Sequence, residues 1–243
     1  MTKPSITEYL LSSSEAAQYY QRATQSKFLE LAGQGRLSRE RLSQWLSHDR
    51  LYAQAYIRFI GGLISRDQLP TDTGDEGTGS TLQWRIFLLL QAALSGISRE
   101  LLFFEETARK YGLDLAAIDD KAKGVTQEYI DLFDSFTAQP GGNQTKTLLD
   151  GLVLLWSTEK VYLDAWTYAR QQTPAHEDAS QDLDGGALRK EFIPNWTSEE
   201  FHSFVNECQE VLDAYAAIQS ADNALEIFGK VLILEEQFWP PAA

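Results

Sequence analysis

The feature that most constrains the fold of this chain is the spacing of its apolar residues, which recur every three and four positions over long stretches. That spacing puts apolar side chains on one face of an α-helix. Almost no segment alternates as a β-strand would, so we expect an all-α, multi-helix bundle that spans residues 1–243 as one domain. The predicted helices cover about residues 14–32, 38–65, 81–111, 125–138, 144–171, 198–219 and 222–238.

Several of these helices have recognisable capping residues. Ser38 has the side chain of a typical N-cap. Gly112 follows the third helix, where glycine commonly takes the left-handed capping conformation. Thr197 and Glu200 have the T-x-x-E spacing of a capping box, which predicts the start of a helix at this point.

Charge and composition limit the partners of this protein. The formal net charge is −14, and nucleic acids and anionic membranes require basic surface, so we expect neither as a partner. No uninterrupted run approaches the roughly 18 apolar residues of a membrane span, and the N-terminus shows no secretory signal. We therefore expect a soluble, cytoplasmic protein. The acidic, polar segments 66–80 and 171–186 are expected to be solvated loops.

Three acidic residues lie on apolar, aromatic helix faces. Asp49, Glu159 and Glu235 each share a face with large apolar side chains when the helices are projected at 3.6 residues per turn. These neighbours are Trp45, Tyr52 and Tyr56 for Asp49; Trp156, Tyr162 and Trp166 for Glu159; and Phe228, Leu232 and Trp239 for Glu235. A single such acid is equally well explained by a structural hydrogen bond or a place at the edge of the stripe. Three in one bundle favour an interior polar pocket.

The last helix separates two adjacent glutamates. Glu235 projects to the apolar side of the helix, whereas Glu236 lies about 100° away and is expected to face solvent. Apolar surroundings raise the pKa of a carboxyl group towards values that suit acid–base chemistry. Glu235 is therefore the better candidate for a functional role.

Few residues are available for metal, haem or nucleophilic chemistry. The chain has three histidines, His48, His176 and His202. Glu199 and His202 form one Glu-x-x-His pair, without the second pair that a di-iron bundle requires. We therefore predict surface or hydrogen-bonded histidines, no metal and no cofactor. The single cysteine, Cys208, has no basic neighbour and is predicted to be a core residue.

Four segments, taken in order, resemble the TenA/thiaminase II family. They are RLSQWLSHDRLYAQAYIRFIGGLIS, ISRELLFFEETARKYGLDL, FIPNWTSEEFHSFVNECQEVLD and the terminal EEQFW, which has the family's Glu-x-x-Phe-Trp pattern. The resemblance covers nearly the whole chain, with insertions at the two acidic loops. It implies a haem-oxygenase-like all-α fold without haem, and a homodimer or homotetramer. It also implies hydrolysis of a small-molecule substrate in thiamin salvage, from aminomethyl pyrimidine to hydroxymethyl pyrimidine plus ammonia.

The same resemblance implies substrate-binding residues. Asp49 falls on the aspartate that hydrogen-bonds the aminopyrimidine, and Tyr52 on an aromatic residue of the pocket. Tyr129 matches a pocket tyrosine, and Tyr162 matches a tyrosine on the helix of LLWSTEKVYLDAW. Trp196 falls where a tyrosine is usual, so ring stacking is kept while the hydroxyl is lost.

Catalytic roles also follow from the resemblance. Glu235 falls on the family's catalytic glutamate. Many members carry a nucleophilic cysteine where alignment on Tyr162 places Thr158, so the chain resembles the cysteine-lacking branch, in which acidic residues take over. Glu159 is the candidate for the second carboxylate. In this scheme Asp49 holds the ring, Glu235 protonates the departing amine, and Glu159 orients or deprotonates the attacking water.

Two other functions are compatible with this fold. One is a non-catalytic protein that binds a flat heterocycle or serves as a scaffold. Such a protein would need neither the cysteine that the family has at Thr158 nor the tyrosine hydroxyl that it has at Trp196. An oxidase or oxygenase of the same fold is disfavoured by the small number of core histidines.

Overall fold

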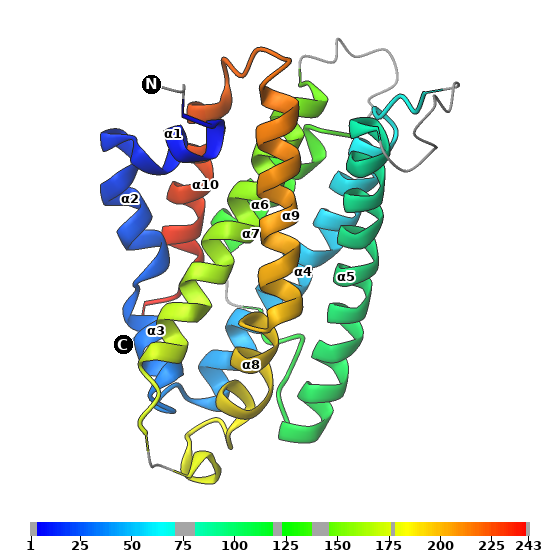
Figure 1. Cartoon of the computed structure of the whole chain (residues 1–243). Helices are drawn as coiled ribbons and strands as arrows, with labels where there is room; N and C mark the ends of the chain where they lie inside the picture. Colours follow the sequence, from blue (N-terminus) through cyan, green and yellow to red (C-terminus); the bar gives the residue numbers. More distant parts are fainter. Residues whose placement is uncertain (1–3, 71–80, 119–122, 138–145, 176–177, 242–243) are drawn as a thin grey trace.

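The described residues form a bundle of α-helices (Figure 1). The computed structural model describes residues 4–70, 81–118, 123–137, 146–175 and 178–241, and no strand occurs within them. The helices are α1 (Ile6–Ser12), α2 (Ser14–Thr24), α3 (Lys27–Gly33), α4 (Arg39–Ile64), α5 (Leu82–Tyr111), α6 (Lys123–Asp134), α7 (Leu148–Gln171), α8 (Ile193–Trp196), α9 (Glu199–Ala216) and α10 (Ala224–Phe238). A 3-10 turn (Ala179–Gln181) and a π-helical turn (Leu188–Phe192) precede α8. The predicted all-α class is confirmed.

Local sequence sets the ends of the long helices. The Ser38 Oγ accepts a hydrogen bond from the backbone N–H of Arg41 (3.3 Å) and caps α4. Gly112 ends α5 with a φ of 66°, in the left-handed region, and its N–H donates to the carbonyl of Ala108. Both predicted helix ends are therefore confirmed.

The capping box predicted at Thr197 and Glu200 is wrong by one position. Ser198 is the N-cap of α9, and its Oγ accepts a hydrogen bond from the N–H of Phe201 (3.2 Å). The Thr197 hydroxyl instead donates to the carbonyl of Ile193 (2.7 Å). The apolar pattern does not predict α8, which is a single turn. Thr197 lies at the end of this turn, so its hydroxyl bonds to α8 and does not cap α9.

The helix predicted over residues 14–32 is in fact two helices, α2 and α3. The Ser26 Oγ accepts a hydrogen bond from the N–H of Leu29 (3.3 Å) and starts α3 anew. A serine side chain offers the backbone this alternative to continuing a helix. The seven-residue α1 is too short to show the pattern. The helix ends predicted at residues 138 and 144 lie outside the described residues.

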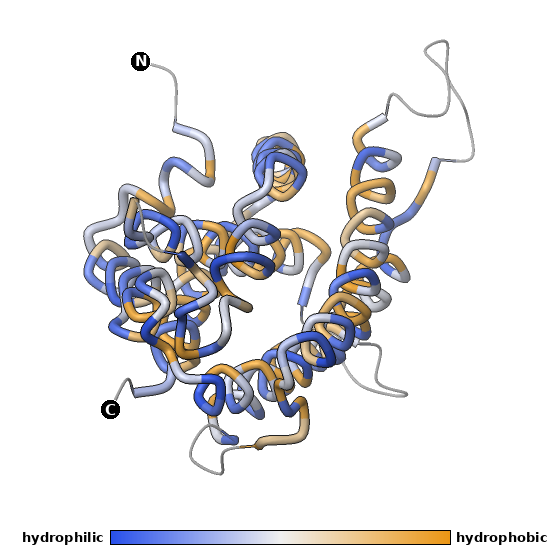
Figure 2. Tube along the Cα trace, turned by 90° about the horizontal axis from the view of Figure 1, so that it is seen from below, coloured by the Kyte–Doolittle hydropathy of each residue, from blue (hydrophilic) through white to orange (hydrophobic). Residues whose placement is uncertain are grey.

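The core of the bundle is rich in indole rings. The ring centroid of Trp45 lies 5.4 Å from that of Trp166, and 5.7 Å from those of Trp196 and Trp239. Helix α10 packs against α2 and α7 (Figure 1) and brings Trp239 to this cluster. Hydrophilic and hydrophobic stretches alternate along the helices (Figure 2), as expected when one side of each faces the core.

Part of the acidic segment 171–186 is packed rather than solvated. Asp182 forms an ion pair with Arg189, and both side chains are only 4% exposed. Asp184 is buried as well, and its carboxylate oxygens accept hydrogen bonds from the N–H groups of Gly186 and Leu188, at 2.8 Å each. The expectation of a solvated loop is wrong for these residues, because composition does not show that an acid is paired with a nearby arginine or backbone donor.

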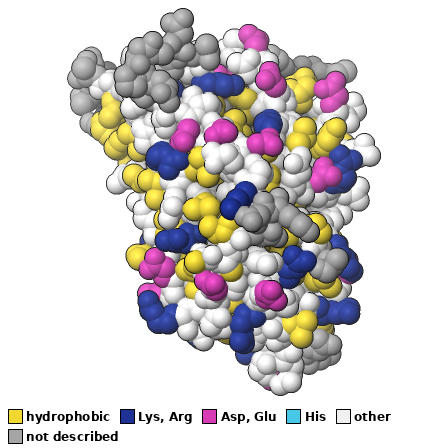
Figure 3. Space-filling view, turned by 180° about the vertical axis from the view of Figure 1, so that it is seen from behind, with side chains coloured by type: hydrophobic (Ala, Val, Ile, Leu, Met, Phe, Trp, Pro, Cys, Tyr) yellow, Lys and Arg dark blue, Asp and Glu magenta, His cyan; other side chains and the backbone are white. Residues whose placement is uncertain are grey.

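Helix α5 forms one side of the bundle (Figure 1). Among the described helices it alone is long and apolar enough to cross a membrane, with a mean hydropathy of 1.5 over a window that is 22% buried. A helix of a water-soluble bundle meets the same criteria, and α5 packs along α4 and α9. In length and mean hydropathy, α5 is thus closer to a membrane-spanning helix than the uninterrupted apolar runs of the sequence indicate. On the rear face of the molecule (Figure 3), acidic and basic side chains are interspersed with hydrophobic ones.

Candidate active site

Carboxylates from α4, α5, α7 and α10 converge inside the bundle. Asp49, Glu100 and Glu159 line one cavity, and Glu235 is close enough to Asp49 to raise its pKa. The remaining lining residues are Tyr52, Ala53, Tyr56, Ile97, Phe104, Thr158, Tyr162 and Phe201. None of the lining residues is basic. The structure therefore builds an acidic interior site with aromatic walls.

Asp49 faces inward from the middle of α4. Its side chain is 4% exposed, and the Tyr162 hydroxyl of α7 donates to its Oδ2 at 3.4 Å. Burial, followed by the charges of Glu100 and Glu235, raises the pKa of Asp49 well above its ordinary value. A carboxyl group that keeps its proton offers a ligand both a donor and an acceptor. A ring amidine has an acceptor nitrogen and a donor amino group, so it needs one donor and one acceptor from its partner.

Glu159 lies on the cavity wall formed by α7. The Tyr56 hydroxyl donates to its Oε1 at 2.5 Å. Burial raises the pKa of Glu159 to about 8; the hydrogen bond from Tyr56 opposes this rise, and the charge of Glu100 adds to it. Glu159 can therefore exchange a proton near neutral pH.

Thr158 occupies the position where the resemblance to the family places a cysteine. Its side chain lines the cavity and is 3% exposed. The hydroxyl donates to the backbone carbonyls of Leu154 and Leu155, at 3.1 and 3.0 Å, within α7. These bonds occupy the proton of the hydroxyl.

Glu235 points into the core, and Glu236 points out, as the helical phase predicts. The Tyr129 hydroxyl donates to Oε2 of Glu235 at 2.6 Å, and burial raises the pKa of Glu235 to about 7. Its Oε1 is buried without a hydrogen-bond partner among the described residues. Glu236 instead forms an ion pair with Arg22 (2.8 Å). Glu235 does not line the cavity itself, but its partner Tyr129 packs against the lining residue Tyr52, with ring centroids 5.0 Å apart.

Glu100 of α5 lines the cavity but is not among the residues predicted from sequence. The indole N–H of Trp196 donates to its Oε1 at 2.5 Å, and burial raises the pKa of Glu100 to about 7. A signal for it was present, because Ile97, Glu100 and Phe104 follow the spacing i, i+3, i+7 along one helix face. The same projection that selected the other acids would have found this one.

The predicted substrate-binding aromatic residues fall into two groups. Tyr52 and Tyr162 line the cavity. Tyr129 and Trp196 do not, because Tyr129 lies behind Tyr52 and Trp196 packs into the indole cluster, 4.3 Å from Trp166. The second group thus supports the walls and holds the carboxylates of the site.

The cavity is small in this structure, with a volume of about 40 Å³. One water molecule needs roughly 10–15 Å³ of such space, so the cavity can hold water but not a ring-sized ligand. A ring-sized ligand requires side chains of the wall to move outward. Phe201, on the first turn of α9, is partly exposed and belongs to this wall.

The described residues contain no group of three or more His, Cys, Asp or Glu side chains arranged to hold a metal ion. His48 is buried, with its Nδ1 2.9 Å from the Oγ1 of Thr126, and Cys208 is buried in the core. His202 is exposed, and His176 lies outside the described residues. His48 and Cys208 are therefore structural residues, as predicted.

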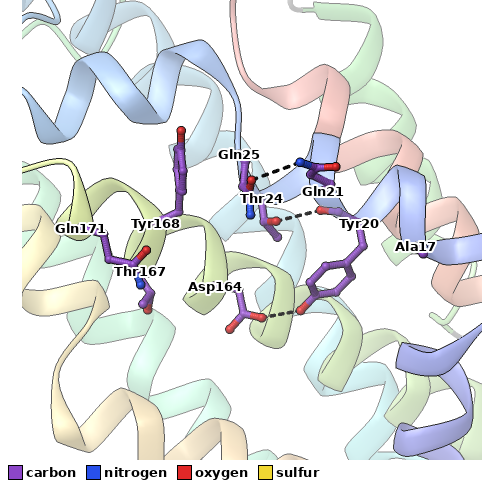
Figure 4. A pocket seen from close by; sticks show the side chains of 9 residues that line it. All are labelled: Ala17, Tyr20, Gln21, Thr24, Gln25, Asp164, Thr167, Tyr168 and Gln171. Carbon is purple, nitrogen blue, oxygen red and sulfur yellow. Dashed lines mark hydrogen bonds between the residues drawn. The ribbon is translucent and has the colours of Figure 1, made fainter.

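A larger cleft, with a volume of about 500 Å³, lies between α2 and α7 (Figure 4). The Tyr20 hydroxyl donates to Asp164 there at 2.5 Å, and Lys160 forms an ion pair with the same carboxylate (2.7 Å). None of the predicted site residues lines this cleft, and its one acid is already paired. The candidate active site is therefore the smaller interior cavity.

Comparison with solved structures identifies the fold. A TenA homologue from Pyrococcus furiosus matches with a TM-score of 0.72 and 23% identity, over 96% of this chain and 97% of that one. A TenA homologue from P. horikoshii OT3 gives 0.72 and 16%, over 97% of each chain. A candidate TenA-like thiaminase from Sulfolobus solfataricus P2 gives 0.66 and 14%, over 98% and 95%. The protein thus has a haem-oxygenase-like all-α fold. Its fold is that of the TenA homologues, which confirms the fold that the sequence resemblance implies.

Sequence comparison adds one longer relative. No family model matches the chain. A probable transcription factor from Fusarium pseudograminearum (strain CS3096) is 32% identical over 247 residues, which cover 90% of this chain. The chain spans about half the length of this curated relative, 47%.

Proposed function

We propose that this protein is a TenA-family hydrolase that converts an aminomethyl pyrimidine from thiamin breakdown into the hydroxymethyl form and ammonia. The observation that carries the proposal is that Asp49 and Glu159 line one interior cavity with Tyr52 and Tyr162, and that Glu235, bonded to Tyr129, is close enough to raise the pKa of Asp49. The fold shared with a TenA-like thiaminase supports a thiamin-related hydrolase. A cytoplasmic homodimer or homotetramer is part of the proposal.

Asp49 is the proposed anchor for the pyrimidine ring. Its raised pKa lets it hold a proton, so that one oxygen donates to a ring nitrogen while the other accepts from the ring amino group. Tyr52 and Tyr162 line the cavity beside it and offer flat faces to the ring. This arrangement binds the ring through shape and paired hydrogen bonds.

Glu235 and Glu159 divide the proton transfers. Water attacks the methylene carbon and gives a proton to Glu159, while the C–N bond breaks and the nitrogen takes a proton from Glu235 to leave as ammonia. A pKa of about 7 keeps Glu235 partly protonated at neutral pH, and its unpartnered Oε1 is the atom available to carry the proton. Because Glu235 does not line the cavity, side chains of the wall must move for the substrate to reach it.

Binding without turnover is the second candidate function. The observation in its favour is that the hydroxyl of Thr158, where the resemblance places a cysteine, donates to backbone carbonyls. Such a protein would hold the same ring in the same cavity and release it unchanged.

One experiment separates the two functions. Purified protein is incubated with aminomethyl pyrimidine, and with thiamin as a comparison substrate, while ammonia and hydroxymethyl pyrimidine are measured. We expect equimolar formation of both products from aminomethyl pyrimidine. A rise in melting temperature with the same compound, without either product, would instead establish the binding function.

A further inference from the structure

Two of the carboxylates approach the same small space from different helices. Glu100 comes from α5 and Glu159 from α7, and both line the interior cavity. Their charges interact, because Glu100 contributes to the raised pKa of Glu159. In the proposed hydrolysis Glu159 takes the proton of the water, and Glu100 has no role.

Each of these acids is held by one donor on one oxygen. Tyr56 donates to Oε1 of Glu159 and Trp196 donates to Oε1 of Glu100, both at 2.5 Å. Both printed bonds go to Oε1, so Oε2 of each carboxyl group takes no part in them. Held through one oxygen, each carboxyl group can offer the other to a small polar molecule in the cavity that both line.

The space beside them can hold water. Its volume of about 40 Å³ exceeds the roughly 10–15 Å³ that one water molecule needs. Ala53, Ile97, Phe104 and Phe201 form the apolar part of its lining. A water with two or more polar partners is a stable occupant of such a cavity.

We propose that Glu100 and Glu159 act as a proton-sharing pair that binds and deprotonates the hydrolytic water. This inference rests on the proposed hydrolysis and adds Glu100 as a catalytic residue. Two carboxyl groups that bind the same water can retain one proton between them, so one member donates a hydrogen bond to the water while the other accepts its proton. The water oxygen then bonds to the methylene carbon, the C–N electron pair passes to nitrogen, and Glu235 protonates that nitrogen. Solvent afterwards takes the extra proton from the pair and returns one to Glu235.

Other ionisable groups face this pair and belong to the same titration. They are Asp49, Tyr52 and Tyr56 of α4, Tyr162 of α7, Cys208 of α9 and Glu235 of α10. Burial raises the pKa of each member of the pair, to about 7 for Glu100 and about 8 for Glu159, and raised pKa values keep the tyrosines neutral. The pair therefore still holds a proton near neutral pH.

The test compares Glu100→Gln with Glu105→Gln, an exposed position on the same helix. Glutamine keeps an oxygen for the Trp196 donor but cannot share a proton. We expect Glu100→Gln to lower kcat about 100-fold with little change in KM. The acid limb of its pH profile should move to lower pH, because loss of the Glu100 charge lowers the pKa of Glu159. Formate should partly restore kcat in Glu100→Ala. Unchanged kcat and pH profile in Glu100→Gln would overturn the inference while leaving the hydrolysis intact.

A second readout does not require activity. Infrared titration of the carboxylic C=O band in wild type, Glu100→Gln and Glu159→Gln reports the protonation of each acid. We expect each single substitution to move the titration of the remaining acid to lower pH. Independent titrations would disprove the pair. Absence of ammonia release by the wild type would count against the proposed hydrolysis alone, since this titration still tests the pair.

Discussion

Glu235 and Glu236 are neighbours in sequence with opposite surroundings. Glu235 is 4% exposed and hydrogen-bonded to Tyr129, whereas Glu236 forms an ion pair with Arg22 at the surface. Ionising the first places a charge among aromatic rings, and ionising the second places it in water. The same chemical group therefore has different effects on stability at two adjacent positions.

This difference predicts the pH dependence of a conservative substitution. The pKa of Glu235 is raised from 4.5 to about 7 in the folded state, so its stabilising contribution is complete below about pH 4.5 and is lost as pH rises through 7. At about pH 8 the loss amounts to about 3 kcal/mol, at about 1.4 kcal/mol per pKa unit. Glu235→Gln cannot ionise, so it should raise the melting temperature at about pH 8 and change it little at about pH 5.

The matched control is Glu236→Gln, measured by thermal unfolding at the same two pH values. It should change stability by less than about 1 kcal/mol at both, because an exposed ion pair contributes little. Identical pH dependence in wild type and Glu235→Gln would show that Glu235 is not buried as a high-pKa acid.

Helical projection predicts which acids face inward, but not which of them meet. It correctly turns Asp49 and Glu235 towards the core, since burial follows from periodicity along one helix. Whether two acids share a cavity depends on how helices cross, which no single helix encodes. For that reason Tyr129 and Trp196 lie behind the cavity wall, and Glu100 joins the site from α5.

At the scale of the element, close approach of α4 and α6 depends on one glycine. A Cβ at Gly62 would lie 2.6 Å from the carbonyl oxygen of Phe136, in the chain just after α6. A Cβ at the adjacent Gly61 would meet nothing within 4 Å. The two positions form a natural pair for testing helix packing.

We expect Gly62→Ala to destabilise the protein by about 1–3 kcal/mol, because backbone must shift to admit the methyl group. Gly61→Ala should stabilise it by about 0.5–1 kcal/mol through helix propensity. Chemical unfolding of both variants measures the difference. Equal stabilities of the two variants would show that α4 and the chain just after α6 are not in this close contact.

Long elements are predicted from sequence better than short ones. The 26 residues of α4 and the 30 of α5 repeat the apolar pattern over many turns and carry clear caps. The single turn of α8 and the seven residues of α1 are too short to repeat it. Their positions depend on tertiary contacts, such as the packing of Trp196 against Trp166.

At the scale of the whole molecule, buried acids and net charge act in the same direction. Burial raises the pKa values of Asp49, Glu100, Glu159 and Glu235, and the chain has a net charge of −14. Raising the pH forces these carboxyl groups to ionise in the core and adds negative charge to an acidic protein. Both effects destabilise the folded state.

The melting temperature of the wild type should therefore fall between about pH 5 and about pH 8. Salt at about 1 M screens repulsion between surface charges but not the cost of ionising buried groups. Thermal unfolding at low and high salt separates the two contributions. A pH dependence that disappears in high salt would assign the effect to the surface and contradict the burial of the four acids.

In the proposed aminopyrimidine hydrolysis, Glu235 serves as the general acid. The most direct test is the ratio of kcat for ammonia release between Glu235→Gln and Glu236→Gln, at the pH optimum of the wild type. We predict a loss of about 10²–10⁴-fold in the first and a wild-type rate in the second. Equal rates in these two variants would contradict the assignment.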